Sequence, residues 1–343
     1  MSDPGTKPPE RATIVAELSG NHGRDLELTR DTLHAIAESS ADAVKIQTYK
    51  PESITLDLTR EPFGPRPSGP WKGQRLFEVY RQGSLPYEWH EEIYALAASL
   101  GLDCFSSPFD EEGVDFLESI GNPVYKVASF EIRHVPLLER IAATGKPVIV
   151  STGIASLADI ELALGILREG TTDITLLKCT SAYPAPIDEV DLRTIPTLRA
   201  AFGVPVGLSD HTMGHAVPVA AVALGAVLIE KHFVLDRSAG GIDASFSMEP
   251  SEFAEMVRNV RMAEAALGSP VYGLGAAASD SATRGRSVFV AADVRQGDTF
   301  TNDNLKVVRP GHGLHPRYYA ELLGKRAKTD IAAGTPLSWD LVD

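Results

Sequence analysis

The sequence has little cysteine, a deficit of basic residues and no long apolar run, and each shortage excludes a class of protein. Only two cysteines, Cys104 and Cys179, occur among 343 residues, so we expect two buried thiols in a reducing cytoplasm rather than a disulfide framework. The chain carries 32 Lys and Arg against 46 Asp and Glu, a net charge of −14, which argues against nucleic-acid binding. No apolar run approaches the roughly 18 residues of a membrane-spanning helix, so no membrane association is expected.

Short runs rich in β-branched residues recur along the chain, separated by polar and amphipathic stretches. There are eight of them, at residues 13–18, 43–47, 102–106, 124–128, 147–150, 174–178, 204–208 and 226–230. This alternation is typical of parallel strands covered by helices on both faces. Eight such units in about 270 residues predict an α/β fold of the closed (β/α)8, or TIM-barrel, type. A doubly wound open sheet is the alternative, but no G-x-G-x-x-G turn follows the first run.

The composition changes after residue 267. Residues 268–283 are rich in Gly, Ala and Ser and read as a linker. Residues 284–343 contain short strand-like pieces broken by Gly, Pro and Asp, which predict a small β-rich domain that leans on another surface. We therefore expect a disordered lead-in at 1–10, a barrel at 11–267, and the linker and small domain after it.

Polar side chains follow every predicted strand. In chain order they are Glu17; Lys45 and Gln47; Ser106 and Ser107; Lys126, Ser129 and Glu131; Ser151 and Thr152; Lys178, Thr180, Ser181 and Tyr183; Ser209, Asp210 and His211; and Glu230, Lys231 and His232. The carboxyl ends of barrel strands converge on one pocket. A single lysine here would more often be a solvated charge, but polar groups at all eight ends indicate an active site.

Two histidines, His211 and His232, end the seventh and eighth predicted strands. Neutral imidazoles on adjacent strands can share one divalent ion and leave other positions for water or substrate. The alternative is two structural histidines that cap backbone groups. That alternative is favoured for a lone histidine, whereas the paired placement favours a metal site. His134 and His215 lack such placement and are interpreted as structural.

Lysines and serines at the strand ends suit an anionic ligand. Lys45 and Lys126, with the hydroxyls of Ser129, Ser151 and Ser209, could hold a phosphate and a carboxylate. Alternatively, the lysines pair with Glu17 and Glu131, or Lys126 forms a Schiff base.

Two carboxylates have more than one interpretation. Glu131 lies two residues after Ser129 and so points to the same side of an extended segment. It can serve as a base or as an ion-pair partner. Asp243 ends the loop 236–243 and could accept hydrogen bonds from sugar hydroxyls, or could be an ordinary loop aspartate.

Six segments together resemble the sialic acid synthase family, which joins phosphoenolpyruvate to an N-acetylated amino sugar. They are AVKIQTY (43–49), YKVASFE (125–131), KPVIVSTG (146–153), KCTSAYPAP (178–186), GLSDHT (207–212) and IEKHF (229–233). KVVRPG (306–311) resembles the antifreeze-like (SAF) domain of those enzymes. The resemblance begins near residue 11 and covers nearly the whole chain.

Three further segments, 70–90, 105–118 and 236–250, resemble the pseudaminic acid synthase branch of the family. The sequence departs from the family at Ser181, where neuraminate synthases carry Asn, at the turn 21–24, and at Ile242 before Asp243.

The resemblance implies a role for each strand-end residue. Phosphoenolpyruvate would be held by Lys45, Ser107, Lys126, Ser129, Ser151, Ser181 and Ser209. The sugar would contact Gln47, Tyr183 and Asp243. His211 and His232 would bind Mn²⁺, with Mg²⁺ and Co²⁺ as alternatives. Glu131 would act in acid–base catalysis beside Lys126, and Glu17 would order water near the ion. Arg309 would reach the barrel of a second subunit in a domain-swapped homodimer.

The expected reaction is the condensation of phosphoenolpyruvate with 6-deoxy-2,4-diacetamido-altrose to give pseudaminic acid and phosphate. The same chemistry on another sugar would give legionaminic or N-acetylneuraminic acid. A non-catalytic carbohydrate-binding barrel is a third hypothesis, which the intact set of strand-end residues argues against.

Overall fold

The computed structural model describes residues 11–343 except 70, 271, 273–274, 276–277, 279–280 and 282. These residues fall into two compact units, one that ends at Gly268 and one that begins at Ser269. The predicted lead-in at 1–10 and much of the predicted linker at 268–283 lie outside the described residues. Among the described helices, none is both long and apolar enough to cross a bilayer.

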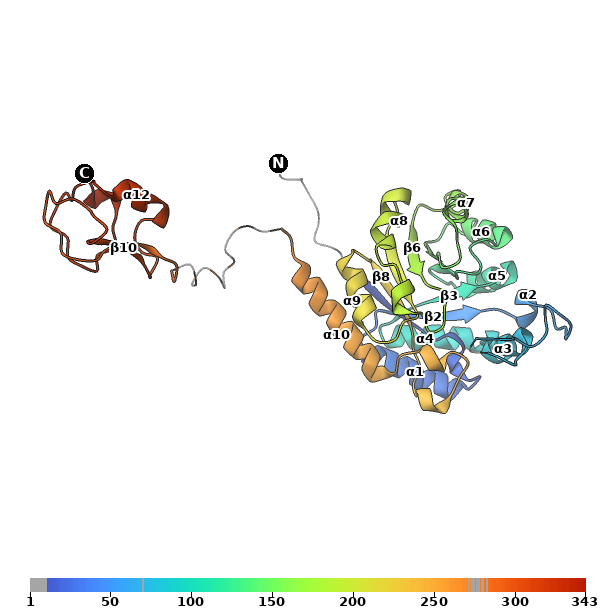
Figure 1. The fold of residues 1–343 in the computed structure, drawn as a ribbon. Helices are drawn as coiled ribbons and strands as arrows, with labels where there is room; N and C mark the ends of the chain where they lie inside the picture. Colours follow the sequence, from blue (N-terminus) through green and yellow to red (C-terminus); the bar gives the residue numbers. More distant parts are fainter. Residues whose placement is uncertain are drawn as a thin grey trace. The chain divides into compact units, whose positions relative to one another are not determined.

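The first unit is a closed barrel of eight parallel strands in chain order (Figure 1). The strands are β1 (Thr13–Glu17), β2 (Ala43–Thr48), β3 (Asp103–Pro108), β4 (Tyr125–Val127), β5 (Val148–Ser151), β6 (Ile174–Cys179), β7 (Val206–Asp210) and β8 (Leu228–His232). Pairing of β1 with β8, from Thr13 opposite Leu228 to Glu17 opposite His232, closes the barrel. The predicted (β/α)8 architecture is confirmed, and the open-sheet alternative is wrong.

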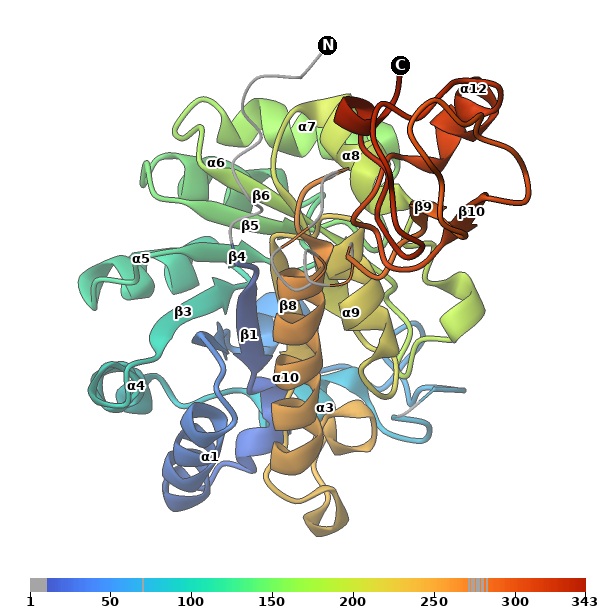
Figure 2. The same cartoon turned by 90° about the vertical axis from the view of Figure 1, so that its left-hand side faces the viewer.

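Helices cover the outside of the barrel. They are α1 (Leu26–Glu38), α4 (His90–Ser99), α5 (Glu111–Ser119), α6 (Val135–Ala142), α7 (Leu157–Leu167), α8 (Thr194–Phe202), α9 (Ala216–Ala223) and α10 (Pro250–Leu267). Figure 2 shows α10 lying along the barrel beside α9. Two additional helices, α2 (Pro51–Ile54) and α3 (Leu76–Gly83), lie in the long connection between β2 and β3.

Side-chain caps define where several of these helices begin. The Asp25 carboxylate accepts hydrogen bonds from the free backbone N–H groups of Glu27 and Leu28 at the start of α1. Reciprocal capping boxes begin α7, between Ser156 and Asp159, and α10, where Glu249 is the cap. The outward-facing strand residues pack against these helices in one continuous apolar core.

The barrel interior changes character along the strands. An apolar layer fills its lower end, made of Val15, Ala43, Phe105, Ile149, Leu177 and Leu228. Two residues further along, the inward positions are polar on most strands, because side chains on the same strand face alternate with a period of two. These positions include Glu17, Lys45, Ser107, Ser151, Ser209 and Glu230. Apolar side chains therefore close the amino-terminal end of the barrel, and polar side chains line its interior toward the carboxyl ends of the strands.

The second unit is small and has a core of its own. Its strands β9 (Ser287–Val290) and β10 (Leu305–Val308) pair antiparallel, and a short helix α12 spans Tyr319–Leu322. Buried side chains such as Val288, Phe300 and Leu337 fill the space between them. The predicted small β-rich domain is confirmed.

Candidate active site

A cavity of about 510 Å³ opens at the carboxyl ends of the barrel strands. Its lining includes twelve of the predicted site residues: Glu17, Lys45, Gln47, Lys126, Ser129, Glu131, Ser151, Tyr183, Ser209, His211, His232 and Asp243. Two more, Ser107 and Ser181, hydrogen-bond to residues of the lining. The remaining one, Arg309, lies in the second unit. The strand ends therefore bring together most of the side chains selected from the sequence.

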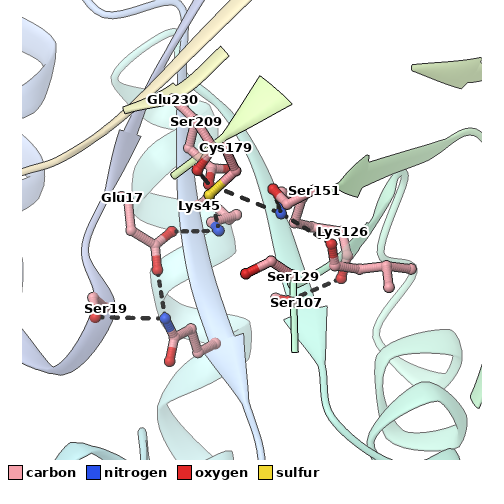
Figure 3. Close-up of polar contacts among 12 residues, drawn as sticks. Glu17, Ser19, Lys45, Ser107, Lys126, Ser129, Ser151, Cys179, Ser209 and Glu230 are labelled. Atoms are coloured by element: carbon pink, nitrogen blue, oxygen red, sulfur yellow. Dashed lines mark hydrogen bonds and ion pairs between the residues drawn. The ribbon is translucent and has the colours of Figure 1, made fainter. Parts of the chain in front are cut away.

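Two buried lysines share one glutamate at the bottom of the cavity. Lys45 Nζ lies 3.1 Å from Glu17 Oε2 and 3.1 Å from Glu230 Oε1. Lys126 Nζ lies 3.9 Å from the same Glu230 oxygen and donates a hydrogen bond of 2.7 Å to Ser151 Oγ. Figure 3 shows these side chains, which come from β1, β2, β4, β5 and β8, converging. The pairing of Lys45 with Glu17 matches one of the alternatives weighed from the sequence.

Burial and charge shift these groups in opposite directions. Burial alone would raise the pKa of the Glu230 carboxyl, but the ammonium groups of Lys126 and Lys45 outweigh it and lower that pKa below its ordinary range. Burial raises the pKa of Glu17 to about 7, because the ammonium group of Lys45 opposes this shift only partly and the Glu230 carboxylate adds to it. Burial also lowers the pKa of Lys126 to about 8, which Glu230 only partly counteracts. Near neutral pH the cluster thus holds two cations against one fully ionised carboxylate and one that is readily protonated.

Serine hydroxyls surround the lysine pair. Ser129 Oγ and Ser181 Oγ lie 2.7 Å apart, and Ser209 Oγ donates a hydrogen bond of 3.0 Å to Glu230 Oε1. Gly153 is needed beside them, because a Cβ at that position would lie 2.0 Å from Ser181 Oγ. Hydroxyl donors next to two ammonium groups can satisfy the oxygens of a phosphate or carboxylate.

The two imidazoles are neighbours in the lining of the cavity. The ring centroids of His211 and His232 lie 5.2 Å apart. His211 Nδ1 lies 3.0 Å from Thr180 O. Since a carbonyl only accepts, Nδ1 carries a proton and Nε2 is the nitrogen that could face an ion, which is the arrangement usual for a metal-binding histidine. Burial lowers the pKa of His232 well below its ordinary value, so this ring is neutral, and its Nδ1 has no partner among the described residues.

These histidines fit a divalent ion that takes two protein ligands. Within the described ranges, no group of three or more His, Cys, Asp or Glu side chains is placed to hold a metal. Two imidazole ligands would leave several coordination positions for water and substrate oxygens, as catalytic sites require. The rings of Tyr183 and Phe246 pack around them, with centroids 4.4 Å (Tyr183 to His211) and 5.1 Å (Phe246 to His232) apart.

Glu131 faces the cavity without a cationic partner. Its Oε2 is buried and has no hydrogen-bond partner among the described residues, and no described lysine or arginine forms an ion pair with it. Burial raises the pKa of its carboxyl to about 7, and the more distant charge of Lys126 only partly opposes that shift. A carboxyl that titrates near neutral pH can exchange protons with a substrate.

Asp243 is fixed from the opposite side of the cavity. Its Oδ2 accepts hydrogen bonds from Ser19 Oγ and, at 3.4 Å, from Gly20 N. Trp71 Nε1, in the connection between β2 and β3, donates to Ile242 O at 3.2 Å. The loop after β8 and the loop after β2 therefore meet across the mouth of the cavity.

Comparison with known proteins agrees with this geometry. The NeuB family profile matches residues 32–272, and the SAF domain profile matches residues 285–343. The chain belongs to the NeuB family.

Relatives match this NeuB family member along almost its whole length. A pseudaminic acid synthase of Helicobacter pylori is 43% identical over 332 residues, which cover 96% of this chain and 97% of the relative. A pseudaminic acid synthase of Campylobacter jejuni is 44% identical over 329 residues, with 96% of each chain covered. The crystal structure of an N-acetylneuraminic acid synthetase from Leptospira borgpetersenii, 30% identical, covers 79% of this chain and 90% of its own, with a TM-score of 0.71.

Sequence reasoning missed the role of Glu230 in this NeuB family barrel. The residue was noted at a strand end but assigned no function, although it links both lysines. The spacing contained the signal, since Glu230 lies two residues before His232 and so faces the same side of β8. By the same alternation along β8, Lys231 points away from the cavity, where it pairs with Asp210. The expectation that all strand-end polar groups converge is therefore wrong for six residues that do not line the cavity: Ser106, Thr152, Lys178, Thr180, Asp210 and Lys231.

Proposed function

We propose that this protein condenses phosphoenolpyruvate with 6-deoxy-2,4-diacetamido-altrose to form pseudaminic acid and release phosphate. The observation that carries the proposal is a single cavity lined by two buried lysines and two neighbouring imidazoles. The names and near-complete coverage of the Helicobacter pylori and Campylobacter jejuni relatives support the choice of reaction.

The two lysines would form the binding site for phosphoenolpyruvate. Lys45 and Lys126 supply the positive charge, and the hydroxyls of Ser107, Ser129, Ser151, Ser181 and Ser209 supply neutral donors. Glu17 helps because its raised pKa lets it take up a proton when an anion approaches. The cluster can then become more positive without moving a lysine. Such preorganised charge also stabilises the phosphate as it leaves.

The sugar would lie nearer the mouth, against Gln47, Tyr183 and Asp243. Apolar side chains of Ile54, Leu76, Val79 and Ile242 also line this cavity. An apolar wall suits the methyl group of a 6-deoxy sugar and leaves the 6-hydroxyl of N-acetylmannosamine without a partner there. This favours the deoxy sugar over the precursor of N-acetylneuraminic acid.

His211 and His232 would hold the divalent ion, with Mn²⁺ as the first candidate and Mg²⁺ or Co²⁺ as alternatives. When bound, such an ion supplies Lewis-acid polarisation of the sugar aldehyde and lowers the pKa of a water molecule. In the overall reaction C3 of phosphoenolpyruvate bonds to the aldehyde carbon, whose oxygen gains a proton. Water adds at C2, and the bond from C2 to the phosphate oxygen breaks. Glu131 would act as a base that takes a proton from this water, and Glu17 would order the same water.

Arg309 and the second unit belong to the same proposal. The match of residues 285–343 to the SAF domain supports a homodimer in which Arg309 enters the barrel of the partner subunit. Two free, buried thiols, Cys104 and Cys179, suit the cytoplasmic location expected from the sequence.

A sugar panel tests the proposed reaction. With Mn²⁺ and phosphoenolpyruvate, phosphate release should be at least about tenfold faster in kcat/KM with 6-deoxy-2,4-diacetamido-altrose than with N-acetylmannosamine, the usual cost of a buried unpaired hydroxyl. The precursor of legionaminic acid is the second comparison, and mass spectrometry identifies each product. Turnover of N-acetylmannosamine alone would overturn the assignment to pseudaminic acid. Absence of turnover with every sugar would favour the carbohydrate-binding alternative.

The pH dependence of kcat/KM should report Glu131 and Lys126. If Glu131 must be ionised to accept a proton, activity falls about tenfold per unit below its pKa of about 7. Activity should fall again above about 8, where Lys126 loses its charge. Glu131→Gln should lower the rate and abolish the acidic limb. An unchanged acidic limb in that variant would assign the titration to another group.

Borohydride trapping with substrate distinguishes charge pairing by Lys126 from a Schiff base.

A further inference from the structure

A second lysine–carboxylate pair lies in the barrel wall behind the two imidazoles. Asp210 on β7 and Lys231 on β8 are register partners, and Lys231 Nζ lies 2.5 Å from Asp210 Oδ2. Both side chains are only 1% exposed. They point away from the cavity, whereas the residue after each of them, His211 or His232, lines it.

The pair also holds the backbone that follows His211. Lys231 Nζ donates to Thr212 O and, at 3.2 Å, to Gly214 O. Asp210 Oδ1 accepts from Thr212 N at 2.9 Å, and Asp210 Oδ2 accepts from the Thr212 hydroxyl at 3.1 Å. The Lys231 ammonium group and both Asp210 oxygens therefore all hydrogen-bond to one short segment, residues 212–214. This segment leads from His211 toward α9.

Stability alone does not explain this arrangement. Burying two charges is costly even when they are paired, and apolar side chains of similar volume often fill such a site as well or better. Asp210 directly precedes one imidazole and Lys231 directly precedes the other. Any contact that fixes these two backbones relative to each other also fixes the separation of the two rings.

We infer that Asp210 and Lys231 form a positioning pair that sets the spacing of His211 and His232 and thereby the affinity for the divalent ion. This inference rests on the proposed metal-dependent function. Neither residue touches the ion or a substrate. Partners that orient metal ligands typically change metal affinity by about 10- to 100-fold when they are removed.

The test is a Mn²⁺ titration of the full chain, with free Mn²⁺ followed by its electron paramagnetic resonance signal. Lys231→Met keeps the length of the side chain and removes its charge. Its Kd for Mn²⁺ should rise about 10- to 100-fold, whereas kcat at saturating Mn²⁺ and KM for phosphoenolpyruvate should change little. Asp210→Asn keeps an oxygen acceptor for Thr212 N. Its Kd for Mn²⁺ should also rise, but by a smaller factor. This variant tests the inference if Lys231→Met does not fold.

Lys146→Met is the matched control. It breaks another ion pair with a separation of 2.5 Å, to Glu118, next to the opposite, amino-terminal end of the strands. It should lower Tm without changing the Kd for Mn²⁺. A Lys231→Met protein that loses Tm but binds Mn²⁺ like the wild type would overturn the positioning role. If the wild type itself binds no Mn²⁺, the proposed metal-dependent function fails first, and the two failures are thus distinguished.

Discussion

His211→Ala is expected to slow phosphate release by at least about 10²- to 10³-fold, the effect of removing one preorganised electrostatic group from an active site. His211 Nε2 is the nitrogen that could face the ion, because Nδ1 is engaged by Thr180 O. Its loss would leave His232 as the only imidazole facing the ion. The measurement is a phosphate-release assay with phosphoenolpyruvate, the sugar and saturating Mn²⁺, together with circular dichroism to verify the fold.

His215→Ala is the control for this substitution. It lies four residues further along the same loop, at the start of α9, and does not line the cavity. It should retain nearly full activity. If His211→Ala also retained its activity, catalysis by this cavity would be untenable.

The His211→Ala protein also tests the domain-swapped dimer. Mixed with an inactive Arg309→Ala protein, it should recover about a quarter of the wild-type activity, because half of the random dimers would each contain one intact site. If Arg309 serves the barrel of its own chain, the mixture stays inactive.

Glu230→Gln is expected to lower the free energy of unfolding by about 3 to 5 kcal/mol, the range for breaking a buried ion pair by removing one partner. Glu230 is only 5% exposed and neutralises two ammonium groups. Glutamine keeps the shape but leaves Lys45 with Glu17 alone and Lys126 with no carboxylate partner. Urea denaturation at neutral pH measures the loss.

Glu118→Gln provides the comparison. Glu118 pairs with Lys146, but its side chain is 31% exposed, so its loss should cost less than about 1 kcal/mol. The effect at Glu230 should depend on pH. Since its folded-state pKa is lowered, its contribution is complete above the ordinary value of 4.5 and is lost as the pH falls through the lowered pKa. Equal effects of the two substitutions at neutral pH would mean that solvent screens the buried cluster.

The sequence was sufficient to predict the barrel because its strands are buried on both faces. Near-continuous apolar runs such as Val148–Val150, each ending in a polar residue, arise when helices cover the outside of a barrel and side chains fill its interior. His211 and His232 could be paired by the same reasoning, since adjacent strands of a barrel end side by side.

The orientation of charged neighbours was harder to predict. Glu230 and Lys231 are adjacent, charged and both buried, so composition alone cannot say which one faces the cavity. The choice depends on register, which Leu228 sets by filling the barrel floor. The part of the β2–β3 connection around Trp71 was also hard to predict, because its polar and Gly/Pro-rich residues take their conformation from contacts such as that of Trp71 with Ile242.

The apolar layer at the amino-terminal end of the barrel has a consequence for the order in which ligands bind and leave. Within the described part of the chain, Val15, Phe105, Ile149 and their neighbours close the amino-terminal end of the barrel, so ligands enter and leave the cavity through its mouth. Lys45 lies one inward position deeper than Gln47 on the same strand. A sugar bound at Gln47, as proposed, would lie between the lysines and bulk water. Phosphoenolpyruvate would then have to bind before the sugar, and phosphate would have to leave after the sugar product.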